Sequence, residues 1–176
     1  GGFTITGAGD SLGFGSIVSS AGDINGDGID DIVIGDKFFD VNGDNGYEGR
    51  SYVLFGSKTG ANIDLGNPLS ATKGFVINNS SDGAFVGDRV GSSVSSAGDV
   101  NGDGYGDLLV GASYGGEAYV LYGHAGGFAS ITDIETYVNG GNGFRVHGAA
   151  GSYLGTSVSS AGDVNGDGYD DLLLGS

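Results

Sequence analysis

Short apolar runs alternate along this chain with clusters of glycine, asparagine, aspartate and serine. The runs are rich in valine, isoleucine, leucine and aromatic residues, which is typical of strands that lie between tight turns. No stretch keeps the apolar period of an α-helix for long enough to predict a long one. Residues 63–69 and 131–138 are each expected to form no more than a helical turn. The pattern therefore predicts an all-β fold.

Four strand-like segments recur in the same order. The first is built from small residues, as expected of a strand in a crowded interior: residues 16–21, 92–97 and 156–161. The second is an apolar run that ends in glycine: residues 32–35, 108–111 and 172–175. The third comprises residues 50–56 and 117–123, and the fourth residues 2–5, 74–77 and 143–146. This repetition predicts a series of four-stranded antiparallel sheets.

One acidic nonapeptide, Asp-x-Asn-Gly-Asp-Gly-x-x-Asp, lies between the first and second segments of each repeat: residues 23–31, 99–107 and 163–171. The glycine at its sixth position takes a positive φ at little cost, so that the loop curls and aims alternate side chains at one point. Oxygen ligands without histidine or cysteine suit a hard cation, and a flexible loop favours Ca²⁺ over Mg²⁺.

The predicted ligands are side-chain oxygens at positions one, three, five and nine and the backbone carbonyl at position seven. They are Asp23, Asn25, Asp27, Ile29 and Asp31; Asp99, Asn101, Asp103, Tyr105 and Asp107; and Asp163, Asn165, Asp167, Tyr169 and Asp171. The loop is not an EF-hand, which needs a carboxylate at position twelve, where this chain has Ile34, Val110 or Leu174. A single copy would also be compatible with a polar turn, but three copies in the same context favour a metal loop.

A fourth stretch repeats the oxygen spacing between the second and third segments of the first repeat. Its candidate ligands are Asp40, Asn42, Asp44, Gly46 and Glu48. Asn45 stands where the other loops have glycine, and asparagine tolerates positive φ better than most residues. The alternative is a solvated polar loop, so the chain is expected to hold three calcium ions, with this stretch as a candidate fourth site.

Composition narrows the range of partners and locations. The formal net charge is −16 and no basic stripe is present, so nucleic acid is not an expected partner. The chain has no cysteine, hence no disulfide, and no apolar run approaches the ~18 residues of a membrane span. The 40 glycines occupy fixed places in a repeat, which argues against a disordered chain. Weak calcium sites fill at the ~millimolar calcium outside cells, which favours an extracellular or cell-surface location.

These features resemble the FG-GAP repeat, the blade unit of integrin alpha-subunit β-propellers. Its signature runs from Phe-Gly through a small-residue strand, the acidic nonapeptide and an apolar strand to Gly-Ala-Pro. Phe14-Gly15 keeps the first element, and Gly111-Ala112-Ser113 nearly keeps the last. The other copies depart from it: Val90-Gly91, Leu154-Gly155, Gly35-Asp36 and Gly175-Ser176. The resemblance implies a seven-bladed propeller, Ca²⁺ between strands one and two, and ligands docked on the opposite face.

On this basis the chain comprises about two and three-quarter blades of four antiparallel strands. Residues 1–15 are expected to form the outer strand of a preceding blade and the turn after it, and residues 16–79 the first blade. Residues 80–148 form the second blade, and residues 149–176 the first two strands of a third. Sheets with uncovered faces need neighbours, so the expected partner is the remainder of a longer propeller chain or further copies of this one.

Aromatic residues gather on the connections at the expected ligand face: Phe38, Phe39, Tyr47, Tyr114 and Tyr153. Aromatic side chains on loops often mark recognition surfaces. The alternative is that they cover the apolar seams between blades. If they form a recognition surface, it takes a protein or glycan ligand.

The sequence thus favours a non-catalytic extracellular module that acts in adhesion, assembly or ligand recognition. No nucleophile motif or phosphate-binding loop is present, and His124 and His147 have no ligand partner at metal-binding spacing. Two alternatives stay open: an accessory propeller domain of a secreted hydrolase, and a carbohydrate-binding propeller.

Overall fold

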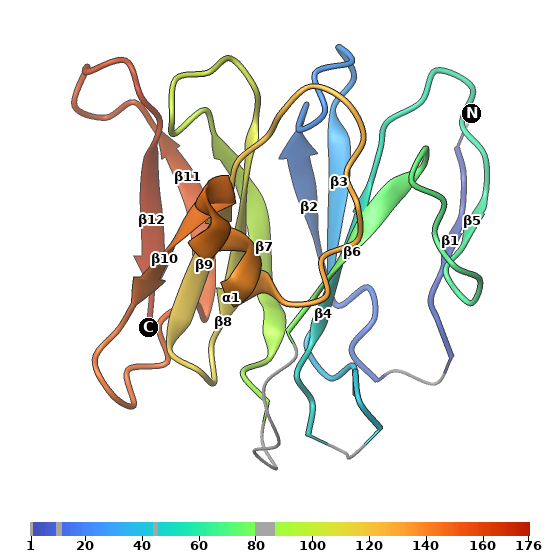
Figure 1. Cartoon of the computed structure of the whole chain (residues 1–176), viewed down its shortest axis with the longest axis horizontal. Coiled ribbons are helices and arrows are strands. Elements are labelled where there is room, and N and C mark those ends of the chain that lie inside the picture. Colours follow the sequence, from blue (N-terminus) through green and yellow to red (C-terminus); the bar gives the residue numbers. More distant parts are fainter. Residues whose placement is uncertain (1, 10–11, 44–45, 80–86) are drawn as a thin grey trace.

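Two four-stranded antiparallel sheets, with strand orders β2-β3-β4-β6 and β7-β8-β9-β10, stand side by side and are followed by the two-stranded sheet β11-β12 (Figure 1). The computed structural model describes residues 2–9, 12–43, 46–79 and 87–176. The expected all-β fold of repeated four-stranded units is confirmed.

The strands lie close to where the pattern of the sequence placed them. The first sheet contains β2 (Ile17–Gly22), β3 (Asp31–Asp36), β4 (Arg50–Leu54) and β6 (Gly74–Asn78). The second contains β7 (Val90–Gly98), β8 (Asp107–Ala112), β9 (Glu117–Leu121) and β10 (Gly143–His147). The third comprises β11 (Ser157–Gly162) and β12 (Asp171–Gly175).

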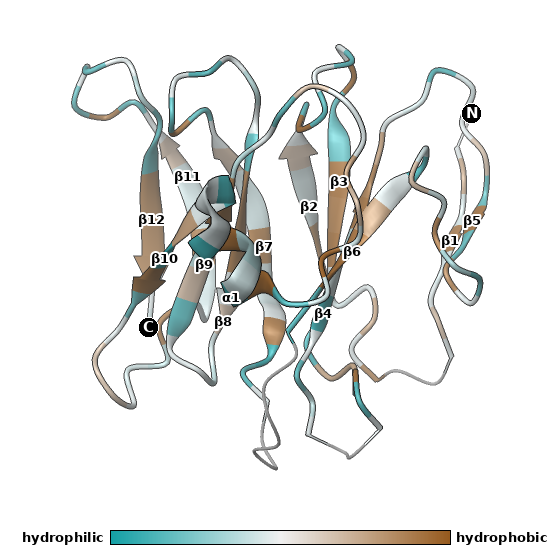
Figure 2. Ribbon diagram, viewed as in Figure 1, coloured by the Kyte–Doolittle hydropathy of each residue, from teal (hydrophilic) through white to brown (hydrophobic). Residues whose placement is uncertain are grey.

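Both faces of each four-stranded sheet carry apolar side chains, because successive residues of a strand point to opposite faces. In β3, Val33 packs into the cluster shared with the second sheet, whereas Ile34 packs with Ile5 and Leu65 on the other side. The second sheet likewise packs Val120 against the β11-β12 pair. Figure 2 shows the resulting brown, hydrophobic strands side by side. The sheets are therefore stacked through their faces, as blades are.

The innermost strands approach each other so closely that side chains are excluded. A Cβ atom added to Gly35 at the end of β3 would lie 2.2 Å from the carbonyl oxygen of Gly91 in β7. The same contact recurs one sheet further on, where a Cβ on Gly111 would lie 2.1 Å from the oxygen of Gly155. In the first two repeats, the glycine near the end of the second segment is thus required for packing against the next unit.

The connections before the outer strands also contact the preceding unit. Ile131 pairs in parallel with Ile77 of β6, and its N–H donates to the carbonyl of Val76 at 2.7 Å. In the same manner β5 (Ile63–Asp64) pairs in parallel with β1 (Ile5–Thr6).

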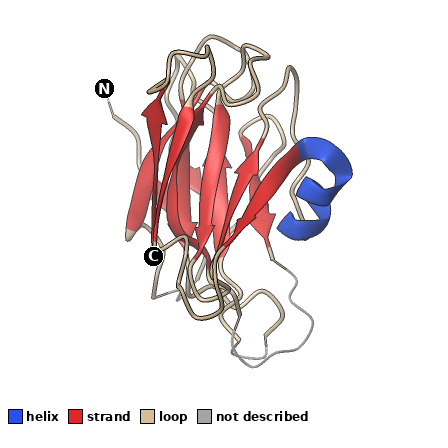
Figure 3. Ribbon diagram, turned by 90° about the vertical axis from the view of Figure 1, so that its left-hand side faces the viewer, coloured by secondary structure: helices blue, strands red, loops and turns tan. Residues whose placement is uncertain are grey.

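The prediction of a helical turn at residues 63–69 is therefore wrong for the first residues of this segment, which form a strand. The N–H groups of Ile63 and Leu65 donate to the carbonyls of Thr4 and Thr6, and these bonds hold the segment extended. The second expected turn is present as α1 (Ile134–Tyr137), where the Asp133 side chain caps the helix, followed by a π-helical turn at Val138–Asn142. Figure 3 shows this helical segment at one side of the sheets.

Candidate functional site

The three acidic nonapeptides lie at the same end of the sheets, in the β2–β3, β7–β8 and β11–β12 loops at the top of Figure 1. Each follows a β-bulge at the end of the first strand, where the pairing shifts between Ser20 and Gly22, Ser96 and Gly98, or Ser160 and Gly162. The three bulge glycines have φ between 67° and 78°, a conformation that glycine adopts without strain. The repeated sequence therefore produces the same entrance into each loop.

Inside each loop the carboxylate at position one organises the backbone. In the second loop, Asp99 accepts hydrogen bonds from the N–H groups of Asp103 at 3.1 Å and Gly104 at 2.9 Å. Asp23 and Asp163 accept the equivalent pairs in the other loops. Hydrogen bonds from Gly168 and its neighbours lower the pKa of Asp163 below its usual value. The hydrogen bonds turn the carboxylate at position one into each loop.

In the first two loops the carboxylate at position nine is buried beneath the loop. Oδ2 of Asp107 accepts from the N–H of Val100 at 2.9 Å, and Oδ1 accepts from the N–H of Gly123, beyond the third strand, at 2.8 Å. Asp31 makes the equivalent bonds in the first loop. Burial raises the pKa of Asp31 and of Asp107 to about 6, although these hydrogen bonds oppose the shift. Through these hydrogen bonds, the aspartate at position nine joins the loop to the residues that follow strand three of the same sheet.

Neighbouring loops touch each other, which the sequence did not predict. The N–H of Gly106 donates to the carbonyl of Asp23 at 3.1 Å, and the N–H of Asp170 donates to that of Asp99 at 3.2 Å. The backbone N–H of Asp99 also donates to the Asp170 side chain at 2.8 Å. The position-eight residue of one loop thus meets position one of the loop before it.

The residues present fit a calcium ion in the kind and charge of their donors. The loops offer only carboxylate, amide and carbonyl oxygens, and each carries three carboxylates at the predicted positions. In the part of the chain that the structure describes, no three acidic, histidine or cysteine side chains converge closely enough to enclose an ion. Their oxygens instead accept the loop's own N–H groups, so binding requires them to turn towards the ion.

The candidate fourth loop, residues 40–48, lies in the β3–β4 connection at the opposite end of the first sheet (Figure 1). Val41 donates to Glu48 Oε2 at 3.0 Å, and Gly43 donates to Asp40 Oδ1 at 2.7 Å. Asp44 lies outside the described residues. Asn42 and Gly46 belong to the same connection.

Four of the five aromatic residues predicted for the ligand face form a continuous row through one arginine. Phe38 and Tyr47 meet edge to face at 5.8 Å between ring centroids, and Tyr114 and Tyr153 at 6.3 Å. The Arg89 guanidinium lies 5.7 Å from the Phe38 centroid and 4.9 Å from that of Tyr114, and so joins the two pairs. We call Phe38, Tyr47, Arg89, Tyr114 and Tyr153 the aromatic row.

Phe39 stands apart from this row. Its ring lies 3.7 Å from the Arg50 guanidinium, a contact within the first sheet.

The tyrosines of the aromatic row are accessible to solvent. Tyr47, Tyr114 and Tyr153 are 40%, 45% and 54% exposed, so they do not simply seal the seam between sheets. Tyr47, Arg89 and Tyr153 also have positive φ values of 55°, 60° and 55°, a strained conformation that tends to occur at functional sites.

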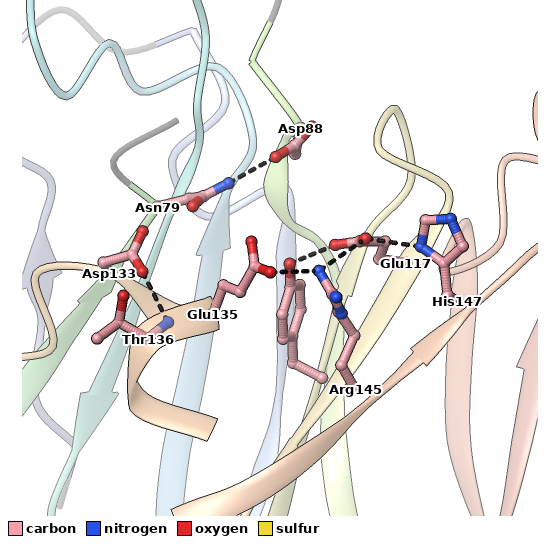
Figure 4. A network of polar contacts seen from close by, with 9 residues as sticks. Asn79, Asp88, Glu117, Asp133, Glu135, Thr136, Arg145 and His147 are labelled. Carbon is pink, nitrogen blue, oxygen red and sulfur yellow. Dashed lines mark hydrogen bonds and ion pairs between the residues drawn. The ribbon is translucent and has the colours of Figure 1, made fainter. Parts of the chain in front are cut away.

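A polar network at the edge of the second sheet was not predicted from the sequence (Figure 4). Glu117 Oε1 lies 3.2 Å from Arg145 and 2.7 Å from His147 Nδ1, and its Oε2 accepts from the Tyr119 hydroxyl. Arg145 also pairs with Glu135 of α1 at 2.7 Å. Because both oxygens of Glu117 have partners, the network is suited to holding β9, β10 and α1 together rather than to proton transfer.

Comparison with known proteins agrees with this arrangement. The FG-GAP repeat family matches residues 14–54, 90–128 and 154–176. Integrin alpha-5 of Xenopus laevis is 31% identical over 89% of this chain, and integrin alpha-PS2 of Drosophila melanogaster is 33% identical over 98% of it. Integrin alpha-3 of Mus musculus is 39% identical over 53% of the chain.

The chain spans between 9% and 14% of the length of these relatives. They are integrin alpha subunits rather than enzymes, which confirms the expectation of a non-catalytic module. Among the described residues, no helix has the length and apolar composition needed to cross a membrane.

Proposed function

Because this chain belongs to the FG-GAP repeat family, we propose that it is a calcium-binding segment of a cell-surface β-propeller that acts in adhesion or ligand recognition. One observation carries the proposal. Three acidic loops with the same internal hydrogen bonds lie in contact at one end of the sheets, and the aromatic row lies at the other. The first end is suited to ions and the second to a partner.

The role of calcium in this proposal is structural. Each loop joins the first two strands of a sheet, and its position-nine residue also reaches strand three where that strand is present. An ion that binds only the folded loop stabilises the fold by linkage, by about 2.7 kcal/mol at a hundredfold excess over the dissociation constant. Without the ion, three carboxylates within one loop repel each other.

The same proposal assigns residues 1–15 to the outer strand of a preceding blade and the turn after it. The support is an equivalence of contacts: Ile63 meets Ile5 just as Ile131 meets Ile77 of β6. Residues 16–79 and 80–148 are then two blades, and residues 149–176 begin a third. Val18 of β2 and Leu173 of β12 remain exposed, as expected if the rest of a longer propeller or another copy of the chain covers them.

The proposed ligand surface is the aromatic row, with a protein or a glycan as the occupant. Rigid aromatic rings around an arginine supply large contact area at small entropic cost. Soluble chain would be assayed for binding to cells and to glycan arrays, with Arg89→Ala and Tyr114→Ala as test variants and Tyr122→Ala, outside the row, as control. Selective loss of binding in the test variants supports the surface, and equal binding by all variants rejects it.

Calcium counting tests the rest of the proposal. The chain is stripped of metal with a chelator and then titrated with calcium by calorimetry. The number of bound ions is expected to fall by one in each of the variants Asp27→Asn, Asp103→Asn and Asp167→Asn. Asp64→Asn, in the short strand β5, is the matched control and should remove none. Circular dichroism is expected to show a partial loss of sheet structure on stripping, which calcium restores. A stripped chain that binds no calcium at millimolar concentration and keeps its spectrum would overturn the proposal.

A further inference from the structure

Glu48 is a buried carboxylate with an unused oxygen. It lies two residues before the start of β4 at Arg50 and is 1% exposed. Its Oε2 accepts from the N–H of Val41 at 3.0 Å, whereas its Oε1 has no hydrogen-bond partner. No lysine, arginine or histidine of the described ranges forms an ion pair with it. A buried anionic oxygen in this state is costly unless a cation or another donor reaches it.

The loop in front of Glu48 repeats two hydrogen bonds of the three nonapeptides. The bond from position two to position nine, Val41 to Glu48, matches the bond from Val100 to Asp107. The bond from position four to position one, Gly43 to Asp40, matches those in the second and third nonapeptides. Gly43 also has a positive φ of 81°, as do Gly26, Gly102 and Gly166 at 73°, 75° and 77°.

Glu48, at position nine of this loop, differs from Asp31 and Asp107 in one respect that points to a ligand. In the first two nonapeptides the second oxygen of the aspartate accepts the N–H of Gly56 or Gly123, beyond the third strand. Glu48 comes before the third strand of its sheet, and no such N–H reaches its Oε1. Because Oε2 is bonded to Val41 inside the loop, the carboxylate faces the loop rather than the core.

We propose that the β3–β4 connection binds a fourth divalent cation of the calcium class, through Glu48, Asp40, Asn42 and the carbonyl of Gly46. That carbonyl accepts the N–H of Gly87 at 2.5 Å, and a carbonyl oxygen has a second lone pair for an ion. The donors are all oxygen and carry two negative charges, which suits a hard cation. This site lies at the end of the sheets opposite the three nonapeptides (Figure 1).

The ion would connect the first sheet to the second. It would also fix the position of Tyr47, which lies at one end of the aromatic row. The backbone of Glu48 accepts the N–H of Val90 in β7 at 2.9 Å, and Gly87 packs directly on it. Tyr47, next to Glu48, contacts Phe38 in the row. A cation in this loop therefore holds Tyr47 in place at the proposed ligand surface. The inference rests on the proposed function only in sharing its calcium chemistry.

The test counts calcium bound to the full chain after chelator treatment, by equilibrium dialysis and calorimetry. Glu48→Gln keeps the size of the side chain and removes its charge, and it should lower the count by one ion. Asn42→Ala changes an exposed side chain and should weaken the same site even if Glu48→Gln does not fold. Asp64→Asn is the matched control and should leave the count unchanged.

Two results separate this inference from the proposed function. A count that falls by one in Glu48→Gln supports the fourth site, whether or not the nonapeptides bind. Equal counts and affinities in the unmodified chain, Glu48→Gln and Asn42→Ala overturn it, and Glu48 then serves only as the acceptor for Val41. Loss of ions in the nonapeptide variants is a separate readout that concerns the proposed function alone.

Discussion

The ring of Tyr169 covers Gly102 in the preceding metal loop so closely that a Cβ atom on Gly102 would lie 2.6 Å from its Cε1 atom. Tyr105 covers Gly26 in the same way, at 2.4 Å. In both cases position seven of one nonapeptide lies on position four of the nonapeptide before it. The loops therefore form a row in which each shapes its neighbour.

This contact predicts that Tyr169 supports ion binding in the loop at residues 99–107. Tyr169→Ala removes the ring that holds Gly102 and should weaken that site by roughly 1 kcal/mol, or about fivefold. Calorimetry on an Asp27→Asn, Glu48→Gln, Asp167→Asn background leaves the middle loop as the remaining candidate site. Tyr169→Phe keeps the ring and should bind as before, so weakening by both variants would contradict the packing explanation.

Asp107 is predicted to stabilise the fold even without calcium. Asp107→Ala leaves the N–H groups of Val100 and Gly123 without their acceptor, at a cost of about 1–3 kcal/mol for each buried group. The free energy of unfolding, measured by urea denaturation in chelator, should fall accordingly. Asp171→Ala is the control, because Asp171 accepts from one backbone N–H and is less buried. Equal losses in the two variants would count against the clamp to strand three.

Close packing of the inner strands predicts an asymmetry between two glycines. Gly111→Ala places a methyl group against the backbone of Gly155, and overpacking of this kind costs about 1–3 kcal/mol. Gly127→Ala meets no atom within 4 Å and should change stability by less than ~0.5 kcal/mol. Thermal unfolding of both variants measures the difference. Similar melting temperatures of the two variants would show that the inner strands can move apart to accommodate the methyl group without loss of stability.

Asp88 is predicted to make stability depend on pH (Figure 4). Burial raises the pKa of its carboxyl above the ordinary 3.8. The hydrogen bond from Asn79 lowers the pKa, the charges of Glu117 and Glu135 raise it further, and Arg145 lowers it. The folded state thus binds this proton more tightly than the unfolded state does.

The contribution of Asp88 to stability therefore falls as the pH rises from 3.8 through its raised pKa. Asp88→Asn has no such proton, so the difference in unfolding free energy between the unmodified chain and this variant should change over that range. Urea denaturation in chelator, from about pH 4 to about pH 8, avoids the separate effect of calcium release. Parallel pH profiles would contradict the prediction.

Local patterns were sufficient to predict the strands and the loops between them. The nonapeptide carries its own turn residues, and its hydrogen bonds, such as those of Asp99 with Asp103 and Gly104, join residues within a few positions of each other. The segment at residues 63–69 was misassigned because its conformation is decided by pairing with Ile5 and Thr6, which lie far away in the sequence. The pairing of Glu117 with His147 was missed for the same reason.

The sequence by itself determined the repeat, the four strands of each unit and the identity of the candidate metal donors, because all of these depend on short-range spacing and side-chain chemistry. Only the tertiary structure decided that the metal loops touch, that Arg89 completes the aromatic row, and that Glu48 is buried with an open oxygen. These features arise where separate sheets meet. Spacing along one chain does not specify contacts between sheets, since those depend on how the faces pack.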